Sequence, residues 1–197
     1  MRSIIILCGG RSRRMGKDKG SLVLNDKPML MHVLDAVKEI ADEIVLVLRD
    51  KEQIDKYKTI LKGIELSIIV VTDETKDQGP LVGILTGLSY IKSDYAQILP
   101  CDSPFISKSF VLKMFEIAES KEFDAVVPIW DDGHIEPLHS IYRKNILVII
   151  RDLIKNKRRN VKSLIDNLNV KYVDVEELDE STMSFRNLNT VEEFEGI

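Results

Sequence analysis

The chain has 197 residues, of which 44% are hydrophobic and 30% are charged, and its net charge is −4. This balance is typical of one globular domain with a full-sized core, and it excludes a disordered or fibrous chain. The acidic balance argues against a nucleic-acid binder, so any anion site must be local. Because the apolar runs are too short to span a bilayer and no secretory signal is evident, we expect no membrane contact and a cytoplasmic location.

Apolar runs of strand length alternate with amphipathic helical patterns, which predicts an α/β fold with a mostly parallel sheet. Strands are expected at residues 3–8, 43–48, 66–72, 95–99, 124–129 and 170–174. Helices are expected at about 28–40, 51–62, 80–92, 107–120, 144–156 and 161–168. An Asp-Gly turn signal within 131–142 predicts a strand pair or a loop excursion. Because no Gly/Ser linker or repeat interrupts the pattern, we expect a single domain over residues 1–197.

Two cysteines, Cys8 and Cys101, stand at the ends of predicted strands. A disulfide between them is possible, but two thiols in a chain with a sufficient core favour a reducing compartment.

The loop after the first predicted strand reads LCGGRSRRMGKDK over residues 7–19. Glycines let backbone N–H groups converge on an anion, and the added cations suit a polyphosphate. The loop is not a P-loop, because five residues separate Gly10 from Gly16 and Asp18 stands where Ser or Thr is needed. The dinucleotide fingerprint does not fit either.

Residues 7–19 resemble the signature loop of nucleotidyltransferases with a three-layer, Rossmann-like (GT-A-like) fold. The resemblance is greatest to the molybdenum cofactor guanylyltransferase (MobA) family, although Cys8 replaces a more common alanine. It implies a nucleotidyltransferase with a mostly parallel central sheet, in which Arg14 and Lys19 are catalytic. It also implies that the nucleotide is bound by Lys19 and by the stretch Leu7, Cys8, Gly9 and Gly10, with loop N–H groups from Cys8 to Gly10 facing the phosphates.

Residues 98–107, ILPCDSPFIS, carry an aspartate just past a predicted strand. A carboxylate there is well placed to hold Mg2+ against phosphate oxygens, since Mg2+ takes one or two carboxylates plus substrate. The segment also resembles the PCDxPF motif of the same family. Asp102 is therefore expected to be a catalytic, nucleotide-binding and metal-ligating residue.

Residues 72–83, TDETKDQGPLVG, end one strand and open a helix. Small residues allow a base or ribose to approach the free N–H groups at the helix start. The resemblance to the D…GPLxG pattern implies nucleotide contacts at Asp73 and Gly79. Together with Gly9, this segment favours GTP over CTP.

Residues 186–194, RNLNTVEEF, resemble the family's N-x-N-T-P-E segment, with Val191 in place of proline. The resemblance implies that Asn187 and Asn189 face the acceptor, while Thr190 also fits a capping box. His139, in the stretch EPLHSIYRK, is expected to be structural.

Two further features bear on the site. Leu48 stands where some family members carry a nucleotide-contacting asparagine, which leaves that contact in doubt. The stretch KNKRRNVK over residues 155–162 is a solvated basic face or an attractor for the acceptor's phosphate.

The resemblance implies Mg2+-dependent transfer of GMP from GTP to the terminal phosphate of molybdopterin or the molybdenum cofactor, giving molybdopterin guanine dinucleotide and pyrophosphate. No general base is expected, because a phosphate monoester needs little deprotonation at neutral pH. Two alternatives stay open: a cytidylyl- or other small-molecule nucleotidyltransferase, and a non-catalytic GTP-binding module. Transient contacts with other cofactor-biosynthesis proteins or with apo-molybdoenzymes are further partners that the resemblance implies.

Overall fold

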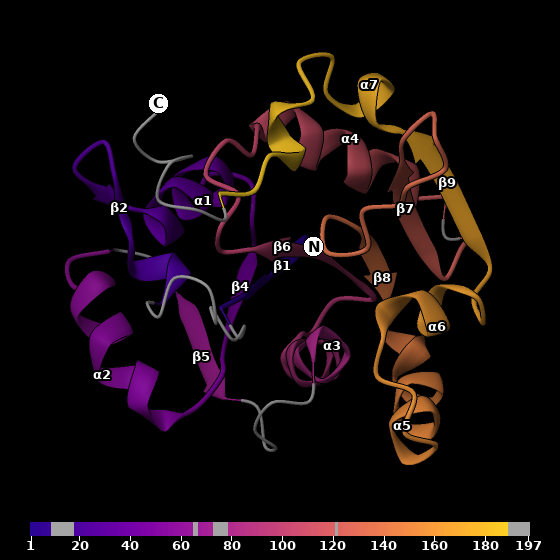
Figure 1. The fold of residues 1–197 in the computed structure, drawn as a ribbon, viewed down its shortest axis with the longest axis horizontal. Helices are drawn as coiled ribbons and strands as arrows, with labels where there is room; N and C mark the ends of the chain where they lie inside the picture. The colour runs from indigo at the N-terminus through magenta and orange to yellow at the C-terminus, as the bar shows by residue number, and fades with distance from the viewer. Residues whose placement is uncertain (9–17, 65–66, 73–78, 121, 189–197) are drawn as a thin grey trace.

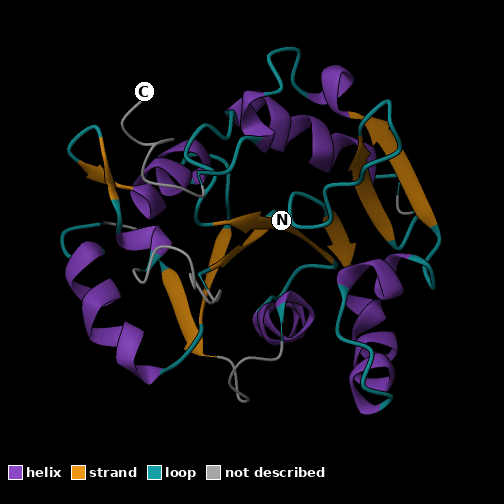
Figure 2. Cartoon of the chain, viewed as in Figure 1, coloured by secondary structure: helices purple, strands orange, loops and turns teal. Residues whose placement is uncertain are grey.

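The computed structural model of the chain places one mixed β-sheet between two layers of helices (Figure 1; Figure 2). The structure describes residues 1–8, 18–64, 67–72, 79–120 and 122–188. Within these residues, seven strands form the sheet: β1 (Ser3–Leu7), β4 (Glu43–Leu48), β5 (Ile68–Thr72), β6 (Tyr95–Pro100), β7 (Ala125–Ile129), β8 (Ile141–Arg143) and β9 (Val170–Asp174). The predicted α/β class with a mostly parallel sheet is confirmed.

The strand order is β5-β4-β1-β6-β8-β7-β9. Strands β5, β4, β1 and β6 are parallel to one another, whereas β8 runs antiparallel to both β6 and β7. In the parallel part, Leu7 at the end of β1 is in register with Val47 on one side and Pro100 on the other. The segments that follow β1, β4 and β6 therefore leave the sheet on the same side, at the carboxyl ends of the parallel strands. This side of the sheet, the carboxyl edge, is where open α/β sheets bind ligands.

The helices cover both faces of the sheet (Figure 1). Their bounds are α1 (Met29–Val37), α2 (Lys51–Ile60), α3 (Pro80–Tyr90), α4 (Lys108–Ala118), α5 (Leu147–Lys155), α6 (Val161–Ile165) and α7 (Val175–Leu178), with 3-10 turns at η1 (Lys19–Ser21), η2 (Lys144–Ile146) and η3 (Met183–Phe185). Side chains of α1, α2, α4 and α7 share a core with Ile4 and Ile6 of β1, while those of α3, α5 and α6 pack with Ile5 and Leu7. Alternate residues of one strand thus enter the two cores.

Helix α3 lies close against β1 because two glycines face the sheet. A Cβ at Gly87 would stand 2.4 Å from Cγ2 of Ile5, and one at Gly83 would stand 3.2 Å from Cδ2 of Leu7. The helix begins just after Gly79, whose φ of 84° is a conformation that favours glycine. The close packing fixes the first turn of α3 beside the carboxyl end of β1.

The segment 131–142 forms an antiparallel bridge between Ile129 and Ile135 and then leads into β8, which agrees with the strand pair or loop excursion expected there. Three local features differ from the sequence prediction. The strand β8 itself was not foreseen, because its three residues are too few to show an alternating pattern. A two-stranded hairpin, β2 (Val23–Leu24) with β3 (Lys27–Pro28), precedes a first helix that is shorter than expected. The short α7 was not predicted. Among the described residues, no helix is both long and apolar enough to cross a membrane.

Candidate active site

Two of the predicted catalytic side chains meet at the carboxyl edge of the sheet. Lys19 opens η1, and Asp102 follows β6 by two residues. The Lys19 Nζ lies 2.6 Å from Oδ2 of Asp102, and both side chains are mostly buried, with 25% and 16% of their surface exposed. Because 83 residues separate the two along the chain, only the sheet topology brings them together. The predicted Arg14 lies outside the described residues.

Asp18 anchors the segment that carries Lys19. Its carboxylate accepts a hydrogen bond of 2.7 Å from the hydroxyl of Tyr57 and one of 3.1 Å from Nε2 of Gln53. Gln53 and Tyr57 are four residues apart on α2, so both face the same side of that helix. The sequence interpretation missed both residues, although their helical spacing and the aspartate inside the loop motif were available signals.

The packing beneath Lys19 is tight. A Cβ at Gly20 would lie 2.4 Å from the Tyr57 hydroxyl oxygen and 3.0 Å from Sγ of Cys101. Burial, reinforced by the neighbouring Cys8, Cys101 and Asp18, raises the pKa of Tyr57, so its hydroxyl stays a donor. A hydrogen bond with Cys8, together with complete burial, raises the pKa of the Cys101 thiol well above its usual range. Both cysteines are free thiols here.

The predicted nucleotide-binding residues fall into two groups. Leu7, Cys8 and Gly79 lie at the carboxyl edge, at the end of β1 and the start of α3. The N–H of Cys8 donates to the Val47 carbonyl at 2.8 Å, which removes it from the N–H groups expected to face phosphate. Gly9, Gly10 and Asp73 lie outside the described residues.

Asp102 is the predicted metal ligand. The described residues hold no group of three or more His, Cys, Asp or Glu side chains that could bind a metal by themselves. A single carboxylate still suits Mg2+, because this ion keeps several waters and takes phosphate oxygens of a substrate. Among the described residues, the donor set at Asp102 therefore fits a cation that arrives with a nucleotide.

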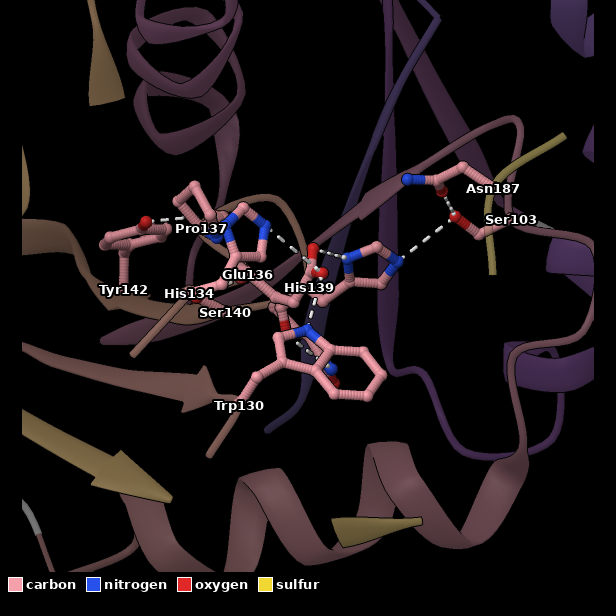
Figure 3. Close-up of polar contacts among 10 residues, drawn as sticks. Ser103, Trp130, His134, Glu136, Pro137, His139, Ser140, Tyr142 and Asn187 are labelled. Atoms are coloured by element: carbon pink, nitrogen blue, oxygen red, sulfur yellow. Dashed lines mark hydrogen bonds and ion pairs between the residues drawn. The ribbon is translucent and has the colours of Figure 1, made fainter. Parts of the chain in front are cut away.

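Asn187 is held next to Asp102 by the chain segment after η3. The N–H of Leu188 donates to the backbone carbonyl of Asp102 at 3.0 Å, and Leu188 is fully buried against Leu24 and Met29. The Ser103 hydroxyl donates a short hydrogen bond to Oδ1 of Asn187 (Figure 3). The second predicted acceptor residue, Asn189, lies outside the described residues, as does Thr190.

A buried polar relay continues from Ser103 away from Asn187 (Figure 3). Nε2 of His139 lies 3.1 Å from the Ser103 hydroxyl, and its Nδ1 lies 3.4 Å from Oε2 of Glu136. The other carboxylate oxygen of Glu136 accepts from the Trp130 indole at 3.0 Å. The Phe185 ring packs edge-on against the imidazole, with centroids 5.4 Å apart. His139, which was expected to be structural, has an exposure of 0%.

Leu48 and the basic stretch 155–162 lie in different parts of the molecule. Leu48 is fully buried in the core on the α1 side of the sheet, so its side chain does not offer a nucleotide contact. The basic stretch 155–162 passes close to the start of α3, because the Arg159 carbonyl oxygen lies 3.5 Å from where a Cβ at Gly79 would stand.

Comparisons with known proteins identify the family. Residues 4–172 match the model of the MobA-like NTP transferase domain. A relative from Methanothermobacter thermautotrophicus, named "Probable molybdenum cofactor guanylyltransferase", is 37% identical over 97% of this chain and 96% of its own length. A relative from Methanocaldococcus jannaschii with the same name is 33% identical over 96% of this chain and 94% of its own length.

Solved structures share the fold. Molybdopterin-guanine dinucleotide biosynthesis protein A from Archaeoglobus fulgidus has a TM-score of 0.83 at 24% identity, covering 100% of this chain and 96% of the other. A 4-diphosphocytidyl-2C-methyl-D-erythritolsynthase from Anaerococcus prevotii has a TM-score of 0.71 at 20% identity, covering 100% and 95%. The family match, the full-length relatives and the Lys19–Asp102 pair at the carboxyl edge lead to one conclusion: the chain is a nucleotidyltransferase that belongs to the MobA-like NTP transferase family, the family of the molybdenum cofactor guanylyltransferases.

Proposed function

We propose that the enzyme transfers GMP from GTP to the terminal phosphate of molybdopterin or the molybdenum cofactor, with Mg2+ held by Asp102. The observation that carries the proposal is the contact between Lys19 and Asp102 at the edge of the sheet where β1, β4 and β6 end. The names of the full-length relatives supply the guanine nucleotide and the cofactor acceptor.

The reaction joins one oxygen of the acceptor phosphate to the α-phosphorus of GTP. The bond from the α-phosphorus to the oxygen that bridges it to the β-phosphorus breaks, and pyrophosphate leaves with that electron pair. The acceptor phosphate is a dianion near neutral pH and attacks without a general base. Catalysis then depends on positioning and on neutralising charge, as in other phosphoryl transfers.

Lys19 is the described cation best placed for this task. Its ammonium is mostly buried, and a buried charge acts on phosphate oxygens more strongly than an exposed one. The bonds from Tyr57 and Gln53 to Asp18 fix the backbone beside it, so the ammonium is held before substrate binds. Arg14 and the glycines of the loop are proposed to add further donors.

Asp102 would supply the protein ligand for Mg2+, which, when bound, neutralises charge on the phosphates. The carboxylate is oriented by Lys19 through Oδ2, and its backbone is fixed on both sides, by the β1–β6 pairing and by the bond from Leu188. The same backbone bond ties the nucleotide side to the segment that carries Asn187, which we propose contacts the acceptor.

The basic stretch 155–162 has a place in the same proposal. The backbone of Arg159 lies beside Gly79, the residue just before α3. We propose that this stretch attracts the acceptor's phosphate to the carboxyl edge, and that it is more than a solvated face.

The experiment is to incubate the protein with molybdopterin and Mg2+ plus each of GTP, CTP, ATP or UTP, and to measure pyrophosphate and the dinucleotide product. Pyrophosphate and product are expected with GTP far above the other nucleotides. Turnover with CTP alone would assign the enzyme to the cytidylyl class, and GTP binding without pyrophosphate would indicate a non-catalytic module. A thermal-shift assay gives the binding readout, because a ligand that binds the folded state raises the Tm.

A further inference from the structure

The charge on Glu136 sets the chemistry of the relay described above. Burial favours the neutral carboxyl, but the facing His139 and the Trp130 indole outweigh burial, and the pKa of Glu136 is lowered. Its carboxylate is therefore ionised and can only accept hydrogen bonds. It lies 3.4 Å from Nδ1 of His139, an atom that is buried and has no hydrogen bond of ordinary geometry among the described residues. This pairing favours a proton on Nδ1, so Nε2 can donate as well only if the ring carries both protons, as an imidazolium that faces the Glu136 carboxylate.

The proton count at Ser103 then links His139 to Asn187. The Ser103 hydroxyl has one proton, and it is donated to Oδ1 of Asn187. The same oxygen can therefore meet Nε2 of His139, 3.1 Å away, only by accepting from an N–H. In the opposite arrangement, Ser103 would donate to Nε2, and its oxygen could accept only from the Nδ2 of Asn187. The amide of Asn187 would then be turned around.

We infer that His139 is a positioning residue for the acceptor: with both ring nitrogens protonated, it donates from Nδ1 toward Glu136 and from Nε2 to Ser103. It thereby turns Oδ1 of Asn187 inward and leaves Nδ2 to donate to the acceptor. Figure 3 shows the amide nitrogen of Asn187 on the side away from the dashed bond to Ser103. An N–H donor suits an acceptor that carries phosphate, whereas a carbonyl oxygen would repel it. The inference rests on the proposed function, because Asn187 faces the acceptor only there.

Three variants test the inference by kinetics. His139→Gln keeps an amide N–H near the place of Nε2, whereas His139→Asn places its amide near Nδ1 and loses the donor to Ser103. Ser103→Ala removes the relay itself. We expect His139→Asn and Ser103→Ala to raise the KM for the acceptor about threefold to tenfold, as the loss of one hydrogen bond would. The KM for GTP should not change, and His139→Gln should restore most of the acceptor KM.

Ser3→Ala is the matched control. Ser3 is also fully buried and donates to a carboxylate, Oε1 of Glu43 at 2.7 Å, but it lies at the amino edge of the sheet. This variant should lower the Tm without changing the acceptor KM. If His139→Asn and His139→Gln share one acceptor KM while both lower the Tm, His139 is merely structural and the inference is overturned.

A measurement without turnover separates this inference from the proposed function. In 1H–15N NMR spectra of the full chain, Nε2 of His139 should carry a proton, and the Asn187 side-chain amide should shift in Ser103→Ala and His139→Asn but not in Ser3→Ala. An unprotonated Nε2, or an unmoved Asn187 amide, overturns the inference even if the enzyme makes product. Absence of product from the wild-type chain with GTP, Mg2+ and molybdopterin overturns the proposed function, while the NMR result still decides the relay.

Discussion

The two edges of the parallel part of the sheet both hold buried polar groups, yet they differ in what those groups contact. At the amino edge, Glu43 accepts from the Ser3 hydroxyl at 2.7 Å and from the Lys92 N–H at 2.9 Å, and Ser93 donates to the Tyr95 carbonyl. These bonds join the first residues of β1 and β4 to the turn before β6. At the carboxyl edge, Lys19 and Asp102 meet between segments that have left the sheet.

The difference shows that a buried polar cluster is not by itself a site. The amino-edge cluster satisfies groups that the fold must bury, which is a structural requirement. The carboxyl-edge cluster places a cation, a carboxylate and an amide where loops diverge from parallel strands and leave room for a ligand. Loss of a side chain at the amino edge should therefore lower stability, whereas loss of a side chain at the carboxyl edge should lower turnover.

The largest effect is expected at Asp102. Asp102→Asn should lower kcat by about 10^3-fold or more, because the uncharged amide does not neutralise Lys19 and binds Mg2+ more weakly than a carboxylate. The matched change at the amino edge, Glu43→Gln, should leave kcat unchanged and lower the free energy of unfolding by about 1–2 kcal/mol. Pyrophosphate release and urea unfolding measure the two quantities. Normal turnover of Asp102→Asn would place the metal site elsewhere.

A smaller loss is expected at Lys19. Lys19→Ala should lower kcat on the order of 10^2-fold, if its ammonium contacts the charge that develops on the phosphates. Lys17→Ala, in the same loop, should cost far less. Lys58→Ala is a control on α2, where the lysine is exposed and pairs with Asp55 at 3.5 Å. Steady-state rates of pyrophosphate release measure these effects. Equal small effects at Lys19 and Lys17 would refute the catalytic role of Lys19.

Gly20 tests the support beneath Lys19. Gly20→Ala would place a Cβ 2.4 Å from the Tyr57 oxygen, so Tyr57 must move away from Asp18. We expect a loss of about 1–3 kcal/mol in the free energy of unfolding, as for other overpacked sites, and a lower kcat. Combining Gly20→Ala with Tyr57→Phe removes the clashing oxygen and should recover part of the stability in urea unfolding. If the double variant lost more free energy of unfolding than the two single variants lose together, this packing would be contradicted.

The smallest effect is the pH dependence that Cys101 contributes. Its pKa is raised in the folded chain by the bond with Cys8 and by burial, so the folded state holds this proton more tightly than the unfolded state. The contribution to stability is full below the unfolded pKa of about 8.5 and is lost as pH rises above it, by up to about 1.36 kcal/mol per pH unit. Urea unfolding at pH 7.5 and 9.5 should show a shallower decline for Cys101→Ala than for the wild-type chain. If the free energy of unfolding fell equally with pH in both proteins, the raised pKa of Cys101 would be contradicted.

Much of the fold was predictable because its signals are local. The runs that became β1 and β4 are apolar after their first residue, and the run that became β6 is interrupted only by Gln97, as expected for strands covered on both faces. β8 was not foreseen as a separate strand of the sheet, because three residues carry no period and its antiparallel direction depends on where β6 and β7 lie. The helix at 28–40 was predicted too long at both ends: Pro28 pairs with Val23 in a hairpin, and the residues after Val37 form a turn.

The candidate site, like the fold, was predictable only where its signals are local. The sequence by itself determined the family, the glycine- and arginine-rich loop, and the choice of Lys19 and Asp102, because these residue types occur at fixed spacing within short motifs. It could not determine that Tyr57 and Gln53 hold Asp18, or that His139 and Ser103 hold Asn187. Those contacts join segments about 35 to 84 residues apart. Only the tertiary structure decides them, because a hydrogen bond depends on the distance between two side chains in space, and that distance is set by the order and direction of the strands.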